Sequence, residues 1–169
     1  MATALFVGRF QPFHNGHLKV IKSIIKENSS VIIGIGSSQE SNTADNPFSY
    51  EERKRMIAET LKANNITRFK ICEIPDFFDD EKWAGYIAQK LPKFDVAYSG
   101  NIVTLGCLKG HGLTVKKVGL INGISSTEIR TRITRDGNWQ AMVPEQIADY
   151  IIRLDGVNRI RKIYANPQS

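Results

Sequence analysis

Short apolar runs alternate along the chain with longer segments in which apolar residues recur every three or four positions. The short runs predict buried strands, and the longer segments predict amphipathic helices. The predicted strands cover residues 4–8, 31–36, 69–74, 96–99 and 114–118. The predicted helices cover residues 18–27, 50–62, 82–90, 102–109, 127–135, 145–154 and 157–164.

This alternation of strands and helices predicts an α/β fold. Apolar strands separated by helices form a parallel sheet that is covered on both faces, and right-handed crossovers give it a doubly wound topology. We therefore expect a doubly wound, five-stranded parallel sheet followed by C-terminal helices. The 169 residues contain no linker or repeat and have the length of a single domain, residues 1–169. In such sheets, ligands bind beyond the carboxyl ends of the strands.

The most informative segment follows the first predicted strand. Residues 8–17 read GRFQPFHNGH and lead from that strand into the first predicted helix. The start of a helix has free N–H groups and a partial positive charge, which suit an anion. His14 and His17 flank Gly16, which has no side chain to keep a phosphate away from the backbone, and Arg9 directly follows the strand. The segment therefore predicts a binding site for a triphosphate.

Two other roles for His14 and His17 compete with this interpretation. The two side chains could cap the helix or lie in the core, or they could bind zinc. A zinc site needs a third protein ligand, and the only other histidine, His111, lies in a Gly-His-Gly turn far along the chain. The position of the pair at a strand-to-helix turn favours the phosphate site.

A second polar segment begins the fifth predicted helix. Ser125 and Glu128 have the spacing of a capping box, which explains one hydroxyl group. It does not explain why Ser126 and Thr127 add two more hydroxyls, with Arg130 in the first turn. Hydroxyls, free N–H groups and a guanidinium at a helix start favour a second anion site.

Composition limits the other functions. The chain has 23 Lys and Arg against 17 Asp and Glu, a net charge of +6. That charge is compatible with nucleic-acid binding, but no RNA-binding motif accompanies it, so we expect no nucleic-acid partner. No apolar run approaches the roughly 20 residues that a membrane helix needs, and no signal peptide is recognisable. We therefore expect a cytoplasmic protein without a membrane partner.

Two motifs and several shorter segments resemble a known family. His14-Asn15-Gly16-His17 matches the H-x-G-H signature of the nucleotidyltransferase superfamily, and residues 124–130, ISSTEIR, match its I-S-S-T-x-x-R signature. Within this superfamily, the chain is similar to the archaeal-type nicotinamide mononucleotide (NMN) adenylyltransferases. The similarity covers nearly the whole chain, and besides residues 8–17 it includes segments 37–41, 46–48, 98–101 and 156–159.

The resemblance implies a Rossmann-like nucleotidyltransferase fold and the reaction ATP + NMN → NAD⁺ + diphosphate. It implies Mg²⁺ bound with ATP rather than by a protein metal site, and a homo-oligomer, often a hexamer. Gln39 interrupts the dinucleotide fingerprint G-x-G-x-x-G, so NAD is expected as the product and not as a bound cofactor. The implied residues are His14, His17 and Arg130 for catalysis; Arg9, Phe10, Gly16, Gly100, Ser125, Ser126 and Thr127 for ATP and its phosphates; and Asp76 and Trp83 for NMN.

Other interpretations share parts of this pattern. Phosphopantetheine adenylyltransferases and cytidylyltransferases also carry H-x-G-H and would use the same chemistry, but the G-R-F-Q-P-F-H form and Trp83 favour NMN. Class I aminoacyl-tRNA synthetases carry a related signature, but this chain has no room for a tRNA-binding domain and no K-M-S-K-S-like loop. A nucleotide-binding regulator without catalysis would also keep these motifs.

The chain departs from the family at one phosphate contact. In the resembling enzymes, an arginine just before the N/D-P-F segment can also reach the phosphates. Here the residues before Pro47 are Ala44, Asp45 and Asn46, and none of them is basic. That particular contact is therefore not expected in this chain.

Overall fold

The computed structural model describes residues 2–119 and 121–167 and confirms the predicted α/β fold. Five parallel strands form one sheet in the order β3-β2-β1-β4-β5. All five lie within one residue of their predicted bounds. The strands are β1 (Thr3–Gly8), β2 (Ser30–Ile35), β3 (Phe69–Glu73), β4 (Val96–Ser99) and β5 (Val115–Lys117).

The seven predicted helices are all present, and a short 3-10 helix that the sequence did not predict, Gln140–Met142, follows the fifth of them. Within the described residues, no helix is both long enough and apolar enough to cross a membrane. The helices are α1 (Asn15–Glu27), α2 (Tyr50–Ala63), α3 (Asp80–Lys90), α4 (Ile102–Gly110), α5 (Ser126–Thr134), α6 (Glu145–Arg153) and α7 (Gly156–Ala165).

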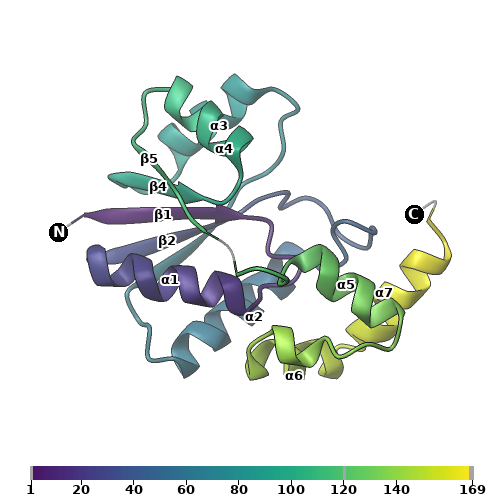
Figure 1. Cartoon of the computed structure of the whole chain (residues 1–169). Coiled ribbons are helices and arrows are strands. Elements are labelled where there is room, and N and C mark those ends of the chain that lie inside the picture. Colours follow the sequence, from purple (N-terminus) through teal and green to yellow (C-terminus); the bar gives the residue numbers. More distant parts are fainter. Residues whose placement is uncertain (1, 120, 168–169) are drawn as a thin grey trace.

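Helices cover both faces of the sheet, as Figure 1 shows. α1 and α2 lie on one face, and α3 and α4 lie on the other. Side chains of a strand alternate between the two faces, so Phe6 packs in the core under α1 and α2, whereas Leu5 and Val7 pack under α3 and α4. The C-terminal helices α5, α6 and α7 extend the first layer beyond the carboxyl ends of the strands.

The order of the strands places a switch point next to the first motif. From β1 the chain moves outward through β2 to β3, and it then returns to the other side of β1 to form β4 and β5. The segments after β1 and β4 therefore diverge at the same edge, which is where open α/β sheets bind ligands.

Candidate active site

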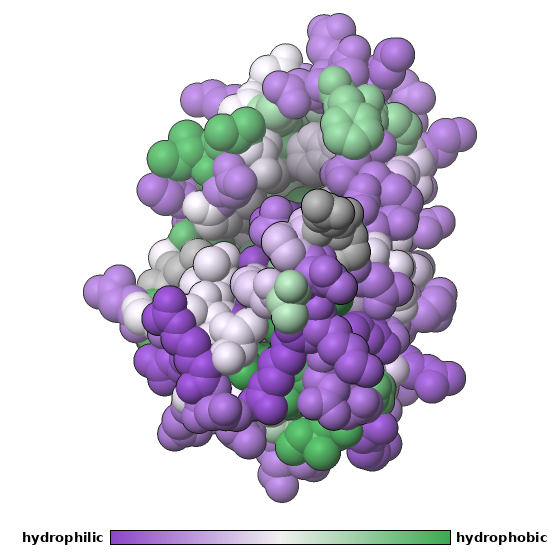
Figure 2. Space-filling view, turned by 90° about the vertical axis from the view of Figure 1, so that its right-hand side faces the viewer, coloured by the Kyte–Doolittle hydropathy of each residue, from purple (hydrophilic) through white to green (hydrophobic). Residues whose placement is uncertain are grey.

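A cavity of about 650 Å³ opens at the carboxyl ends of the strands. Figure 2 views the molecule from this side, and its surface is hollowed between the α3–α4 layer above and the C-terminal helices below. The cavity brings together residues from distant parts of the sequence. Of the predicted site residues, it is lined by Arg9, Phe10, His14, His17, Asp76, Trp83, Gly100, Ser125, Ser126, Thr127 and Arg130.

Gly16 is the one predicted residue that is not part of this lining. A Cβ atom at this position would meet the Cε1 atom of the His14 ring at 2.9 Å. The structure therefore explains the glycine by the ring that lies over it. The close approach of a phosphate, which the sequence suggested as the reason, is not needed to explain the residue.

His14 and His17 combine a place in the cavity with a capping role. The Nδ1 atom of His14 accepts hydrogen bonds from the backbone N–H groups of Gly16 (3.1 Å) and His17 (3.4 Å). The Nδ1 atom of His17 accepts one from the backbone N–H of His14 (3.1 Å). The two side chains form a reciprocal capping box at the start of α1, and their rings stack with centroids 3.6 Å apart.

Burial keeps both imidazoles neutral. It lowers the pKa of His14 to about 4. Burial, and secondly the repulsion that a protonated His14 would exert, lower the pKa of His17 well below its usual value. Because each Nδ1 accepts an N–H bond, the single proton of each neutral ring belongs on Nε2. Each ring therefore offers one uncharged N–H donor to an oxygen atom of a ligand.

Phe10 packs against the ring of His17. Its side chain is 2% exposed, and its ring meets that of His17 edge-on with the centroids 4.8 Å apart. A Cβ atom at Gly8 would approach the Phe10 ring to 2.9 Å, which explains the glycine at the end of β1. Phe10, to which the resemblance assigned a role in ATP binding, thus lines the cavity and also packs against His17.

The three hydroxyl groups at the start of α5 all have partners within the protein. Ser125 caps the helix, accepting a bond from a backbone N–H of the first turn. The Ser126 hydroxyl donates to the carbonyl of Pro12 (2.9 Å), and the Thr127 hydroxyl accepts from Arg130 (3.5 Å). Of these bonds, the one from Ser126 fixes α5 to the segment after β1. The hydroxyls of Ser125 and Thr127 act as acceptors in their bonds, so their O–H groups can still donate to an anion. The backbone N–H groups of the first turn that have no partner inside the helix are further donors.

Arg130 reaches the cavity from a buried position. Its side chain is 3% exposed, and its Nη1 atom donates to the carbonyl of Gln11 (2.8 Å). Its Nε atom donates to the Tyr164 hydroxyl (3.3 Å). A guanidinium has five N–H donors in one plane, so these bonds orient the group and leave donors for a ligand in the cavity.

The α3 side of the cavity is acidic and aromatic. Asp76 follows β3, and Gln39 holds it with two bonds: the Gln39 amide donates to the Asp76 carboxylate (3.2 Å) and accepts from the Asp76 backbone N–H (3.1 Å). Trp83, in the first turn of α3, lines the same end and packs against the core under α3 and α4. Asp79 and Asp80 complete this wall.

Comparison with known proteins agrees with this geometry. A family model described as cytidylyltransferase-like matches residues 5–132, from β1 to α5. A nicotinamide-nucleotide adenylyltransferase of Methanococcus aeolicus is 41% identical over 162 residues, which are 95% of this chain and 94% of the relative. The enzyme of the same name from Thermococcus sibiricus is 40% identical and covers 94% of this chain and 88% of the relative. This chain belongs to the nicotinamide-nucleotide adenylyltransferase family.

A solved structure supports the fold of this adenylyltransferase family member. It is a bifunctional NMN adenylyltransferase/ADP ribose pyrophosphatase from Francisella tularensis, complexed with AMP and a manganese ion. Its TM-score to this chain is 0.76 at 23% identity, and the match covers 98% of this chain but only 52% of that one. At this identity the likeness shows the fold, and it confirms the Rossmann-like architecture.

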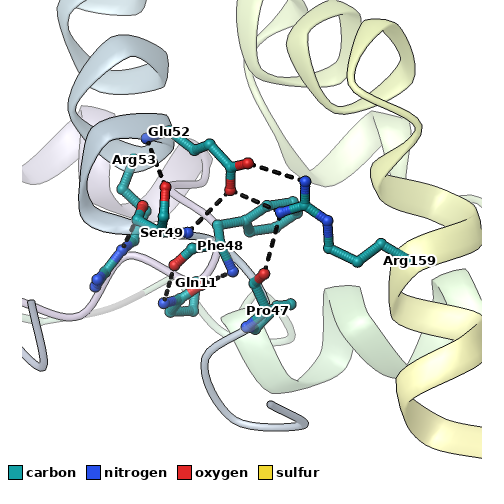
Figure 3. A network of polar contacts seen from close by, with 7 residues as sticks. All are labelled: Gln11, Pro47, Phe48, Ser49, Glu52, Arg53 and Arg159. Atoms are coloured by element: carbon teal, nitrogen blue, oxygen red, sulfur yellow. Dashed lines mark hydrogen bonds and ion pairs between the residues drawn. The ribbon is translucent and has the colours of Figure 1, made fainter. Parts of the chain in front are cut away.

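Two family-like segments that carry no catalytic group have a structural role, which Figure 3 shows. The Gln11 side chain donates to the carbonyl of Phe48 (2.9 Å) and accepts from its N–H (3.0 Å). Arg159 of α7 forms two bonds with Glu52 (2.7 and 2.9 Å) and a third with the carbonyl of Pro47 (3.3 Å). Through these bonds, the loop before α2, which contains residues 46–48, is joined to the first motif at Gln11 and to the last helix at Arg159.

The departure from the family at residues 44–46 brings an acidic group to the site. The Asp45 carboxylate lies 3.7 Å from the Nη2 atom of Arg130, and its side chain is 75% exposed. This carboxylate neutralises part of the charge of Arg130.

Arg53 is a residue that supports the site and that the sequence analysis missed. Its side chain is fully buried, and its guanidinium donates to the carbonyls of Arg9 (2.8 Å), Gly36 (2.8 Å) and Ser37 (3.1 Å). Burial and the nearby Arg9 lower its pKa to about 10, so it is still a cation at neutral pH. It ties together the ends of β1 and β2 at the cavity wall. Nothing in the local sequence distinguishes it from the exposed basic residues of α2.

Proposed function

We propose that this chain catalyses ATP + NMN → NAD⁺ + diphosphate. The observation that carries the proposal is the contrast between the groups that two layers of the fold bring to one cavity. On the side of α1 and α5, two neutral histidines, Arg130 and two helix starts attract a triphosphate, and Arg9 joins them from the end of β1. On the α3 side, Trp83 and three aspartates suit the flat, cationic nicotinamide ring of NMN.

In this mechanism the acceptor brings its own nucleophile. An oxygen of the NMN phosphate attacks the α-phosphorus of ATP, a new P–O bond forms, and the bond to the diphosphate breaks. No protein base is needed, so catalysis consists of positioning and charge stabilisation. The Nε2–H groups of His14 and His17 and the guanidinium of Arg130 would donate hydrogen bonds to phosphate oxygens as negative charge builds on the leaving diphosphate.

Two expectations from the resemblance stay predictions. In the part of the chain that the structure describes, no three histidine, cysteine or acidic side chains come together as a metal site. A Mg²⁺ ion accompanying ATP would therefore take its ligands chiefly from phosphate oxygens and water, as this ion commonly does. The homo-oligomer implied by the resemblance is the second expectation, and the mass of the protein in solution tests it.

The direct test is to incubate the purified protein with ATP, Mg²⁺ and NMN and to measure NAD⁺ and diphosphate. We expect equal amounts of both products. Two further mixtures test the other H-x-G-H activities: phosphopantetheine replaces NMN in the first, and CTP replaces ATP in the second. Diphosphate release in only one of these two mixtures, and not with ATP and NMN, would refute the proposal. Binding of ATP without release of diphosphate in any mixture would identify a regulator instead.

Replacing Trp83 by alanine is expected to raise the KM for NMN by roughly 3- to 30-fold, since a cation–π contact contributes about 0.5–2 kcal/mol. The KM for ATP should stay nearly unchanged, because the triphosphate end of the cavity is not altered. Steady-state kinetics with each substrate varied in turn measure both constants. Trp83→Phe keeps an aromatic face and should retain most of the affinity. If the KM values for NMN and ATP rise together and the melting temperature falls, Trp83 acts only by packing in the core.

Replacing Asp45 by asparagine is expected to lower the KM for ATP by about 1.5- to 5-fold, the range that an exposed ion pair permits. The change removes a negative charge that competes with phosphate for Arg130. The matched control is Asp136→Asn, because Asp136 pairs with Arg161 away from the cavity. An unchanged or higher KM in Asp45→Asn would show that Asp45 does not oppose the triphosphate.

A further inference from the structure

The last helix, α7, contacts the loop before α2 at two points. At its start, Arg159 donates to the carbonyl of Pro47 (3.3 Å). At its end, the Tyr164 hydroxyl donates to the carbonyl of Ala44 (3.4 Å). The loop segment that contains Asp45 is thus held from both sides by one helix, although α7 comes more than 100 residues later in the sequence.

Tyr164 also contacts the buried arginine of the site. The Nε atom of Arg130 donates to the Tyr164 hydroxyl at 3.3 Å. A phenolic hydroxyl both donates and accepts, so this one group links Arg130 on α5 to Ala44 on the loop. The family signatures did not indicate this contact, because residue 164 lies beyond the last segment that carries the resemblance.

The bond at Nε determines how Arg130 presents its other donors. A guanidinium is planar, and bonds at Nε and at Nη1, which donates to Gln11, fix the orientation of that plane. A plane that is fixed before the ligand arrives loses less conformational freedom on binding. Without the bond to Tyr164, the carbonyl of Gln11 would be the only short hydrogen-bond partner of the group among the described residues.

We propose that Tyr164 is a positioning residue that orients Arg130 toward the phosphates of ATP. The inference rests on the proposed function, because it takes ATP as the ligand of Arg130. Tyr164 is not among the described residues that line the cavity, so it acts on the nucleotide through Arg130. The last helix thereby becomes a functional part of the site as well as a layer of the fold.

A double-mutant cycle on ATP binding tests the proposal. Tyr164→Phe removes only the hydroxyl, and it should weaken ATP binding by about threefold to tenfold, the range expected for one hydrogen bond. Arg130→Lys has no Nε donor. Adding Tyr164→Phe to it should therefore change the affinity by less than about 1.5-fold, because the two residues act as one unit. Titration calorimetry with ATP measures all four proteins, and their melting curves are recorded in parallel.

The matched control is Tyr150→Phe. It removes a tyrosine hydroxyl from the neighbouring helix α6, where the ring lies against Arg153 outside the cavity. Its ATP affinity should equal that of the unmodified protein. An equal loss from Tyr164→Phe in both backgrounds, or no loss in either, would overturn the positioning role. NAD⁺ formation is measured on the same proteins: a chain that binds ATP with this coupling but forms no NAD⁺ refutes the proposed reaction and leaves the role of Tyr164 standing.

Discussion

Replacing His17 by alanine is expected to lower kcat by about 30- to 900-fold, which corresponds to roughly 2–4 kcal/mol of barrier for a lost transition-state donor. The physical reason is the loss of the Nε2–H group, which the neutral ring of His17 presents to the cavity. Single-turnover measurement of NAD⁺ formation at saturating ATP and NMN isolates this effect from substrate binding.

The same substitution is also expected to lower the melting temperature. The reason is that His17 caps α1 and that its ring lies 5.3 Å from that of Phe13 and 4.8 Å from that of Phe10. The loss of a capping group alone destabilises a protein by about 1 kcal/mol.

His17→Gln separates these two effects. Glutamine is a standard residue at this position of a capping box, so its side-chain oxygen should accept the bond from the backbone N–H of His14 and retain much of the stability. Its amide cannot place an N–H where the imidazole Nε2 lies, so turnover should still fall strongly. Near-normal turnover in both variants would remove His17 from the catalytic residues.

The sequence predicted the sheet and its covering helices because those elements follow local patterns. β4 was predicted with the bounds that it has, since residues 96–98 form a short apolar run and Ser99 leads into the turn Gly100-Asn101. α1 begins at Asn15, three residues before the predicted start at position 18. The reason is its cap: His14 fills the position where Ser, Thr, Asp or Asn is the usual signal, so the ordinary rule for a helix start did not apply.

The sequence also predicted most of the cavity, because the carboxyl ends of parallel strands meet at one edge. Residues that follow β1, β3 and β4 could be placed there without a structure. The contacts that hold the cavity wall together could not be predicted from the sequence. Arg53 reaches carbonyls 16 to 44 positions away, and Tyr164 binds a carbonyl 120 positions away. Such contacts depend on how helices pack, and no local periodicity records that.

The hydroxyl groups of the second signature show the same limit. The sequence predicted an anion site from these hydroxyls, and the structure adds a protein partner for each of them that the sequence could not indicate. Ser125 and Thr127 accept in those bonds and keep an O–H donor for the cavity that they line. Arg130 is the one cation of the signature, so its replacement should have the largest effect.

Replacing Arg130 by lysine is expected to lower kcat/KM for ATP by about 10- to 150-fold, or roughly 1.5–3 kcal/mol, the range for hydrogen bonds to a charged group. Lysine keeps the charge but has one nitrogen on a flexible stem, and it cannot copy the planar guanidinium. In the structure, Arg130 donates to the carbonyl of Gln11 and to the Tyr164 hydroxyl and still has donors for the cavity. A single ammonium cannot serve both the carbonyl and a phosphate in that geometry. Initial rates over a range of ATP concentrations measure the loss.

The control for this change lies on the same helix. Arg132 is partly exposed and pairs with Glu128 at 3.0 Å, outside the cavity lining. Arg132→Lys makes the identical chemical change two residues away, and it should leave kcat/KM within about twofold, because an exposed ion pair contributes little. If Arg130→Lys behaves like this control, Arg130 acts as a point charge or lies outside the reacting site. If it loses activity while Arg132→Lys does not, the planar guanidinium itself is required, since both variants keep the charge of the helix.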